Sequence, residues 1–174
     1  MQSILWVSVV FIFLIGGVVW YVLGRDTGIS PREEAVMQDD TVIEKTGELA
    51  QYEGALLAGK SAPIFEFVKS DYEKALQTDK LIVLYFYANW CPICRKEQPA
   101  LMAVFNERTK TDIIGFRVNY NDTATDADEI ALAREFGVAY QHTKVFVKKG
   151  TQVLKSPESW TKDRYILEIA QALQ

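Results

Sequence analysis

The sequence contains little cysteine, little histidine and no excess of basic charge. Only two of its 174 residues are cysteine, and only one is histidine. Two cysteines exclude a framework of several disulfides and a zinc site built from four cysteines. The 19 lysines and arginines are outnumbered by 23 acidic residues, which gives a formal net charge of −4. No nucleic-acid partner is therefore expected.

The chain is long enough for one domain with appended segments. Hydrophobic residues make up 49% of it, which is enough for an ordinary core. We predict three parts: a transmembrane anchor at residues 1–24, a linker at 25–60 and a globular domain at 61–174. The linker is polar and interrupted by glycines, as is typical of a tether.

The anchor is predicted from a long uncharged run, Ile4–Leu23. A helix of about 20 apolar residues matches a hydrocarbon core of roughly 30 Å. Trp6, Trp20 and Tyr21 lie near its ends, where aromatic residues favour the membrane interface. No basic segment precedes the run and no small-x-small cleavage site follows it, which disfavours a cleaved signal peptide. We expect an uncleaved, single-pass membrane protein.

The remaining sequence predicts a domain of alternating strands and helices. Strands are expected at Ile64–Val68, Leu81–Tyr87, Ile113–Asn119, Thr143–Val147 and Gln152–Leu154, and helices at Ser70–Gln77, Cys91–Arg108, Asp128–Phe136 and Thr161–Leu173. The last two strands form a hairpin that turns at Gly150. This order indicates an α/β domain with a mixed central sheet between helices.

Both cysteines lie where the predicted central strand turns into a helix. Leu81–Tyr87 is wholly apolar or aromatic, as suits a strand buried on both faces. Pro92 fits the first helical turn, so Cys91 falls at the helix N-terminus and Cys94 one turn further along. Unpaired amides and the helix dipole stabilise a thiolate there. We expect a redox-active dithiol in which Cys91 is the nucleophile and Cys94 resolves the mixed disulfide.

The residues next to the cysteines argue against a very strong oxidant. The dipeptide between them, Pro92-Ile93, contains no histidine to stabilise the thiolate further. Arg95 and Lys96 add positive charge near the start of the helix, and Glu97 partly cancels it.

The segment from Trp90 to Cys94 resembles the W-C-x-x-C active site of the thioredoxin superfamily. Pro99, five residues after Cys94, matches the proline that kinks the active-site helix of that family. The resemblance covers roughly residues 60–174. It implies a thioredoxin-like fold and a protein-disulfide oxidoreductase without a cofactor. Its partners would be proteins with thiols or disulfides, together with an upstream redox partner that the sequence does not identify.

The resemblance also implies a substrate-binding surface and an orientation in the membrane. The residues expected to meet the substrate are Trp90, Pro92, Ile93, His142 and Thr143. Membrane-tethered domains of this kind usually face the extracytoplasmic side, and we expect the same here. Arg25 and Arg32, which follow the apolar run, favour the opposite orientation.

His142 departs from the family pattern. The segment from Phe136 to Thr143 resembles the family's F-G-V-x-x-x-Pro-Thr, which puts His142 where a cis-proline normally faces the dithiol. A cis peptide before a non-proline residue costs about 2.5–4 kcal/mol, so a trans or strained peptide is expected. Three roles stay open: a surface residue beside the site, a pH-sensitive neighbour of Cys91, or a ligand that joins Cys91 and Cys94 around Cu(I) or Zn(II).

Tyr85 is a second departure. It holds the strand position where many thioredoxins carry a buried carboxylate that takes the proton of the resolving cysteine. Tyrosine is a poor base at neutral pH, so resolution by Cys94 would be slower or would use water. Two rivals to the oxidoreductase remain: a metallochaperone-like module that uses Cys91, Cys94 and His142, and a redox-inert adaptor, which the intact dithiol disfavours.

Overall fold

The computed structural model describes residue 47 and residues 49–174. The predicted transmembrane anchor and most of the predicted linker lie outside the described residues. Within the described part, no helix is both long enough and apolar enough to cross a membrane. The longest described helix, α4 (Pro92–Glu107), has 16 residues, or about 24 Å at ~1.5 Å per residue, which is short of a hydrocarbon core of roughly 30 Å.

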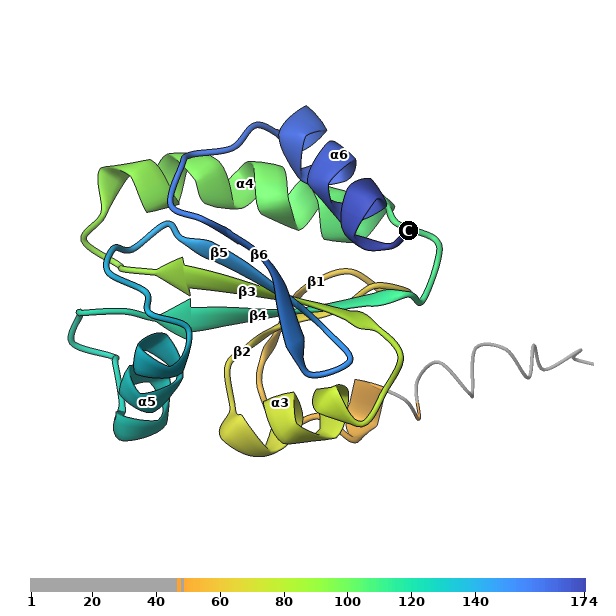
Figure 1. The fold of residues 1–174 in the computed structure, drawn as a ribbon, viewed down its shortest axis with the longest axis horizontal. Helices are drawn as coiled ribbons and strands as arrows, with labels where there is room; N and C mark the ends of the chain where they lie inside the picture. Colours follow the sequence, from red (N-terminus) through yellow and green to blue (C-terminus); the bar gives the residue numbers. More distant parts are fainter. Residues whose placement is uncertain (1–46, 48) are drawn as a thin grey trace, which may run out of the picture. The chain divides into compact units, whose positions relative to one another are not determined.

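A mixed sheet of six strands forms the centre of the domain (Figure 1). The strands are β1 (Leu56–Ala58), β2 (Ile64–Glu66), β3 (Leu81–Tyr87), β4 (Ile113–Asn119), β5 (Lys144–Lys148) and β6 (Thr151–Ser156). Their order across the sheet is β1-β2-β4-β3-β5-β6. The three strands β2, β4 and β3 run parallel, whereas β1, β5 and β6 join through antiparallel pairs. The predicted mixed sheet is confirmed.

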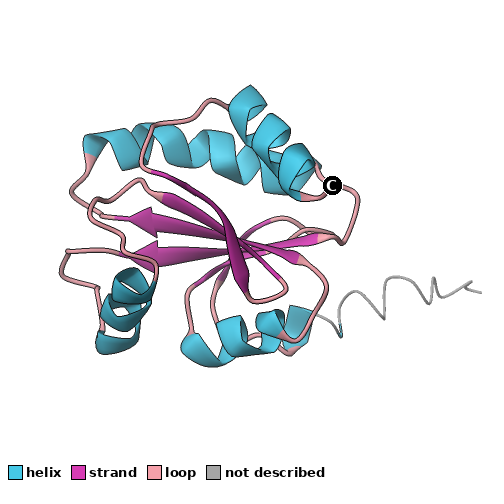
Figure 2. Ribbon diagram, viewed as in Figure 1, coloured by secondary structure: helices cyan, strands magenta, loops and turns pink. Residues whose placement is uncertain are grey.

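Helices cover both faces of this sheet (Figures 1 and 2). Helix α4 and helix α6 (Lys162–Ala172) lie on one face, and α3 (Lys69–Leu76) and α5 (Ala127–Glu135) lie on the other. Side chains alternate along the fully apolar strand β3, so each face receives part of them. Two separate apolar cores result, one under each pair of helices.

Strand β3 shows this division directly. Ile82, Leu84 and Phe86 belong to the core that contains residues of α3 and α5. Leu81, Val83 and Tyr85 belong to the core that contains residues of α4 and α6. The side chains of Leu81 to Phe86 are at most 2% exposed, as the sequence predicted for a strand between two layers of helices.

The domain begins earlier than the predicted boundary at residue 61. The last part of the predicted linker, Leu56–Ala58, forms β1 and pairs with β2. The buried carboxylate of Asp71 accepts hydrogen bonds from the amides of Glu53 (2.7 Å) and Gly54 (2.8 Å), which tie the segment before β1 to α3. Three apolar residues between glycines carry too little periodicity to predict a strand, and only the neighbouring strand makes them one.

Candidate active site

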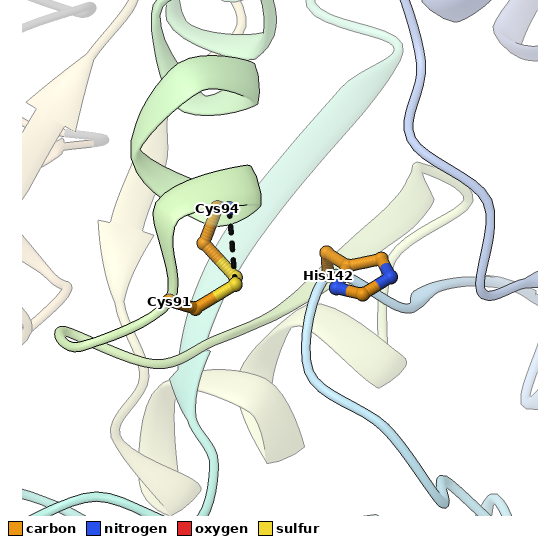
Figure 3. A group of neighbouring side chains, drawn as sticks. All are labelled: Cys91, Cys94 and His142. Atoms are coloured by element: carbon orange, nitrogen blue, oxygen red, sulfur yellow. Dashed lines mark hydrogen bonds between the residues drawn. The ribbon is translucent and has the colours of Figure 1, made fainter.

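The predicted strand, turn and helix around the two cysteines are all present. Cys91 is the N-cap residue of α4, with extended backbone angles, and Pro92 occupies the first helical turn. The amide of Cys94 donates a hydrogen bond to the sulfur of Cys91 over 3.2 Å (Figure 3). Both residues are free thiols and are almost completely buried. The sulfur of Cys91 thus caps the helix, where an amide donor and the helix dipole stabilise negative charge.

The two thiols differ in their surroundings. Burial and the hydrogen bond with Cys91 raise the pKa of the Cys94 thiol to about 12, against an ordinary value of 9.0. Burial disfavours a thiolate wherever no compensating charge is present. Cys94 is therefore a protonated thiol at neutral pH, whereas Cys91 has the helix N-terminus in front of its sulfur. This asymmetry favours the division into a nucleophile and a resolving thiol, which stays a prediction.

A buried ion pair lies one helical turn beyond Cys94. The carboxylate of Glu97 and the ammonium of Lys144 are 2.7 Å apart, and both side chains are fully buried. The same carboxylate oxygen, Oε1, accepts hydrogen bonds from the Trp160 amide (2.9 Å) and the Tyr165 hydroxyl (2.8 Å). Its second oxygen, Oε2, has no hydrogen-bond partner among the described residues. Burial lowers the pKa of Lys144, and the hydrogen bond with Glu97 opposes that shift.

The sequence patterns do not predict this pair. From the sequence, Glu97 is only a charge near the helix start and Lys144 is part of an ordinary strand. A signal was present, because positions 94, 97, 101 and 104 form one buried stripe of α4 and Glu97 is the charged residue in it. A charge on an apolar stripe indicates a buried partner. The partner, Lys144, lies 47 residues further along the chain. The sequence does not identify it, because the contact depends on how β5 pairs in the sheet.

Tyr85 is a packed aromatic of strand β3. It is fully buried in the core on the α4 side, and its hydroxyl donates to the carbonyl oxygen of Cys94 over 3.3 Å. Burial and the charge of Glu97 raise the pKa of Tyr85 far above its usual value. The phenol therefore stays protonated at neutral pH and cannot act there as a base.

His142 lies opposite the dithiol, in the loop before β5 (Figure 3). Its peptide bonds are trans, and its φ of 54° lies in the left-handed region, which few residues other than glycine adopt. The backbone amide of His142 donates to the carbonyl of Phe86 over 2.6 Å, which fastens the loop to β3. Burial and the nearby charge of Lys144 lower the pKa of the imidazole, so the ring is neutral at pH 7.

The structure brings both thiols and this imidazole together. One donor atom from each of Cys91, Cys94 and His142 lies within 4.8 Å of the other two. The Nδ1 atom of His142 is buried and has no hydrogen-bond partner among the described residues. The backbone of Pro157 lies near the ring and partly opposes the lowering of its pKa.

The other predicted site residues are of two kinds: exposed residues that form a rim around the cysteines, and one buried residue that supports the loop of His142. Trp90 and Ile93 are 50% and 46% exposed, and Pro92 between the cysteines is exposed as well. The indole of Trp90 is held in place because its N–H donates to the carbonyl of Asn121 over 2.9 Å. Thr143 differs: it is buried, and its hydroxyl donates to the carbonyl of Tyr140 over 2.7 Å. Its side chain braces the His142 loop and does not line the surface.

The chain matches known proteins over the described domain. The family model described as Thioredoxin matches residues 63–171. Thioredoxin H4 of Arabidopsis thaliana is 40% identical over 87 residues, which are 48% of this chain and 64% of that relative. Thioredoxin H5 of the same plant is 40% identical over 79 residues, 44% of this chain and 58% of the relative. The matched segment thus spans less than two thirds of these relatives. They also contradict the predicted location as a membrane-anchored, extracytoplasmic domain, which we do not retain.

Solved structures have the same fold. Trxlp from Edwardsiella tarda gives a TM-score of 0.53 at 20% identity, and the match covers 61% of this chain and 97% of that one. A mutant thioredoxin from Halobacterium salinarum gives 0.52 at 20% identity, with 67% of this chain and 96% of the other covered. The predicted thioredoxin-like α/β fold is confirmed.

Proposed function

This chain belongs to the thioredoxin family, and on that premise we propose that it is a thiol–disulfide oxidoreductase that acts on cysteines of partner proteins through Cys91 and Cys94. The observation that carries the proposal is the position of the Cys91 sulfur. It caps α4 and accepts the Cys94 amide, while a second thiol lies one helical turn away. A nucleophilic thiolate and a resolving thiol require this arrangement.

In the reducing direction, the Cys91 thiolate attacks one sulfur of a substrate disulfide. A mixed disulfide forms, the substrate S–S bond breaks, and the departing substrate thiolate takes up a proton. Cys94 then loses its proton and attacks the Cys91 sulfur. The Cys91–Cys94 disulfide forms, and the second substrate sulfur leaves as a thiol. Two electrons and two protons have passed from the dithiol to the substrate, and the reverse sequence oxidises a substrate dithiol.

The second step requires deprotonation of Cys94, whose pKa is raised to about 12 by burial and by Cys91. Tyr85 is a protonated phenol and does not serve as the base. The buried carboxylate of Glu97, one turn further along α4, has a free oxygen, Oε2, among the described residues. We assign to it the place of the proton acceptor that a strand carboxylate would otherwise fill.

Substrate proteins would dock on the exposed apolar rim. Trp90 and Ile93 flank the buried sulfurs, and both are about half exposed. Apolar side chains that lose water on docking add affinity without requiring a particular charge on the partner. Such a surface suits an enzyme that acts on protein substrates. Cys91 and Cys94 are each at most 1% exposed. A substrate must therefore present its disulfide close to His142 and the exposed rim.

The proposal is tested with a trapping pair in the full chain. Cys94→Ser keeps the nucleophile but removes the resolving thiol, so incubation with a chromogenic aryl disulfide should leave a stable mixed disulfide on Cys91. Cys91→Ser is the matched control and should form none under the same conditions. Addition of dithiothreitol should release the label from Cys94→Ser. Equal labelling of the two variants, or none in either, would reject Cys91 as the nucleophile.

A further inference from the structure

We propose that the reduced Cys91 and Cys94 bind a thiophilic d10 cation, Zn(II) or Cu(I), together with His142. The site would have three protein ligands, two sulfurs and one imidazole nitrogen. Both cations favour soft thiolate and imidazole donors. The proposal concerns the reduced dithiol itself and does not depend on its exchange activity.

The distances suit such a site. Zinc binds thiolate sulfur at about 2.3 Å and imidazole nitrogen at about 2.0–2.1 Å, which places tetrahedral donors roughly 3.5–3.8 Å apart. The three donors of Cys91, Cys94 and His142 already lie within 4.8 Å of one another. A contraction of about 1 Å, which side-chain rotation supplies, brings them to bonding distance.

The imidazole has the orientation that a ligand needs. Its Nδ1 atom is buried without a hydrogen-bond partner among the described residues, and one ring nitrogen faces the sulfurs in Figure 3. The backbone of Pro157 lies near the ring, and a proton on the other nitrogen, Nε2, would leave the lone pair of Nδ1 for the metal. A histidine ligand in proteins is commonly held by an outer hydrogen bond, which fixes the tautomer and leaves the lone pair for the metal.

The charges also suit a cation. Two thiolates balance Zn(II) and leave a net charge of −1 with Cu(I), and the N-terminus of α4 faces this charge. The buried Lys144 nearby is already neutralised by Glu97 at 2.7 Å, so it presents little repulsion. Three ligands leave a coordination position of Zn(II) open, whereas Cu(I) is satisfied by three.

Metal binding and disulfide formation exclude each other at this site. Formation of the Cys91–Cys94 disulfide removes two electrons and both thiolates, and it reduces a substrate disulfide to two thiolates, which take up two protons from the solvent. The cation is released in its original oxidation state. The redox state of the dithiol would therefore control whether the metal is held.

The test uses the full chain, reduced with a phosphine in the absence of oxygen. Zn(II), and separately Cu(I), is titrated in competition with a chromophoric chelator. We expect one metal per reduced chain and none on the oxidised protein. His142→Ala should weaken metal binding by about 100-fold, because loss of a residue that only supports a ligand already costs about 10- to 100-fold. Cys91→Ser should abolish binding.

Two further variants keep the result interpretable. His142→Asn preserves a residue that tolerates the left-handed backbone, and it should weaken binding as His142→Ala does. Gln141→Ala, next to the ligand, is the matched control and should bind like the unmodified protein. X-ray absorption of the bound metal should give two sulfur neighbours and one nitrogen neighbour from the protein. Unchanged affinity in both His142 variants would overturn the proposal, as would the absence of binding to the reduced protein.

The outcome is separable from the proposed oxidoreductase. The affinity of His142→Asn for the metal tests the metal site, whereas trapping by Cys94→Ser tests the exchange chemistry. A metal-binding protein in which Cys94→Ser traps no disulfide would reject the oxidoreductase and leave the metal site standing.

Discussion

The carboxylate of Glu97 and the ammonium of Lys144 form a fully buried ion pair, 2.7 Å apart, below the redox site. The pair connects α4 to β5, and its hydrogen bonds to Trp160 and Tyr165 extend the connection to the start of α6. A charge buried in this way is stable only while its partner is present, since neither group can reach water. The pair therefore fixes the position of the helix that carries both cysteines.

Removal of one partner should destabilise the domain strongly. Lys144→Met leaves the Glu97 carboxylate buried and unpaired, and the free energy of unfolding should fall by about 3–5 kcal/mol. Urea denaturation followed by circular dichroism measures it. The matched control is Lys162→Met, which removes a surface pair with Glu107 at 39% and 60% side-chain exposure and should cost less than about 1 kcal/mol. The double variant Glu97→Met with Lys144→Met should recover most of the loss. Equal losses of stability in Lys144→Met and Lys162→Met would contradict a structural role for the buried pair.

Alkaline pH should destabilise the reduced protein. Folding raises the pKa of the Cys94 thiol from 9.0 to about 12, through burial and the bond with Cys91. The sign follows directly: the contribution is complete below the unfolded value and is lost as pH rises towards the folded one. Between those values the free energy of unfolding should fall by up to about 1.4 kcal/mol per pH unit from this group.

The measurement compares the reduced protein with Cys94→Ala across this pH range, because tyrosines and lysines titrate in both. The difference between the two curves isolates the thiol. A constant difference would show that Cys94 is not desolvated as the structure has it.

The imidazole of His142 should titrate below the ordinary histidine value. Burial, and secondly the charge of Lys144, lower its pKa from 6.5. Because the sequence contains one histidine, its Cε1 proton gives a single unambiguous NMR signal in the metal-free protein. The midpoint should lie below 6.5 when folded and return to about 6.5 in denaturant. The sign for stability is opposite to that of Cys94: the contribution is present above 6.5 and is lost as pH falls. A folded midpoint at or above 6.5 would place the ring in water.

The exposed rim should matter for protein substrates alone. Ile93→Ser removes an apolar side chain that is 46% exposed beside the dithiol. We expect kcat/KM for a protein disulfide to fall by about tenfold, which corresponds to ~1.4 kcal/mol of lost docking energy. The rate with a small aryl disulfide should be unchanged. Val153→Ser, which alters an exposed valine on β6, is the control, and an equal loss there would remove the argument for the rim.

Local signals in the sequence predicted the parts of the molecule that depend on local physics. The bounds of β3 and β4 were predicted correctly, because each strand is a short apolar run between polar breaks. The position of Cys91 at the start of α4 was predicted from Pro92, whose fixed φ suits the first turn. Each of these features is determined by neighbours within a few residues.

Other features depend on distant parts of the chain. Glu97 and Lys144 meet because β5 pairs antiparallel with β3 and brings Lys144 opposite Tyr85, and no spacing along the chain encodes that register. The left-handed backbone of His142 follows from the hydrogen bond of its amide to Phe86, which exists only once the loop lies against β3. The sequence predicted three possible roles for His142, and only the structure shows that its Nδ1 atom is buried without a hydrogen-bond partner among the described residues.

The division of β3 between two cores has a consequence for how this protein can change. Leu84 and Tyr85 are adjacent in the chain, yet they belong to separate interiors on opposite sides of the sheet. Substitutions that do not touch each other contribute to stability almost additively. The interior under α3 and α5 can therefore accumulate compensating substitutions, in evolution or by design, while the interior that supports the dithiol stays as it is. Selection can thus change stability through the first interior without altering the packing beneath the dithiol.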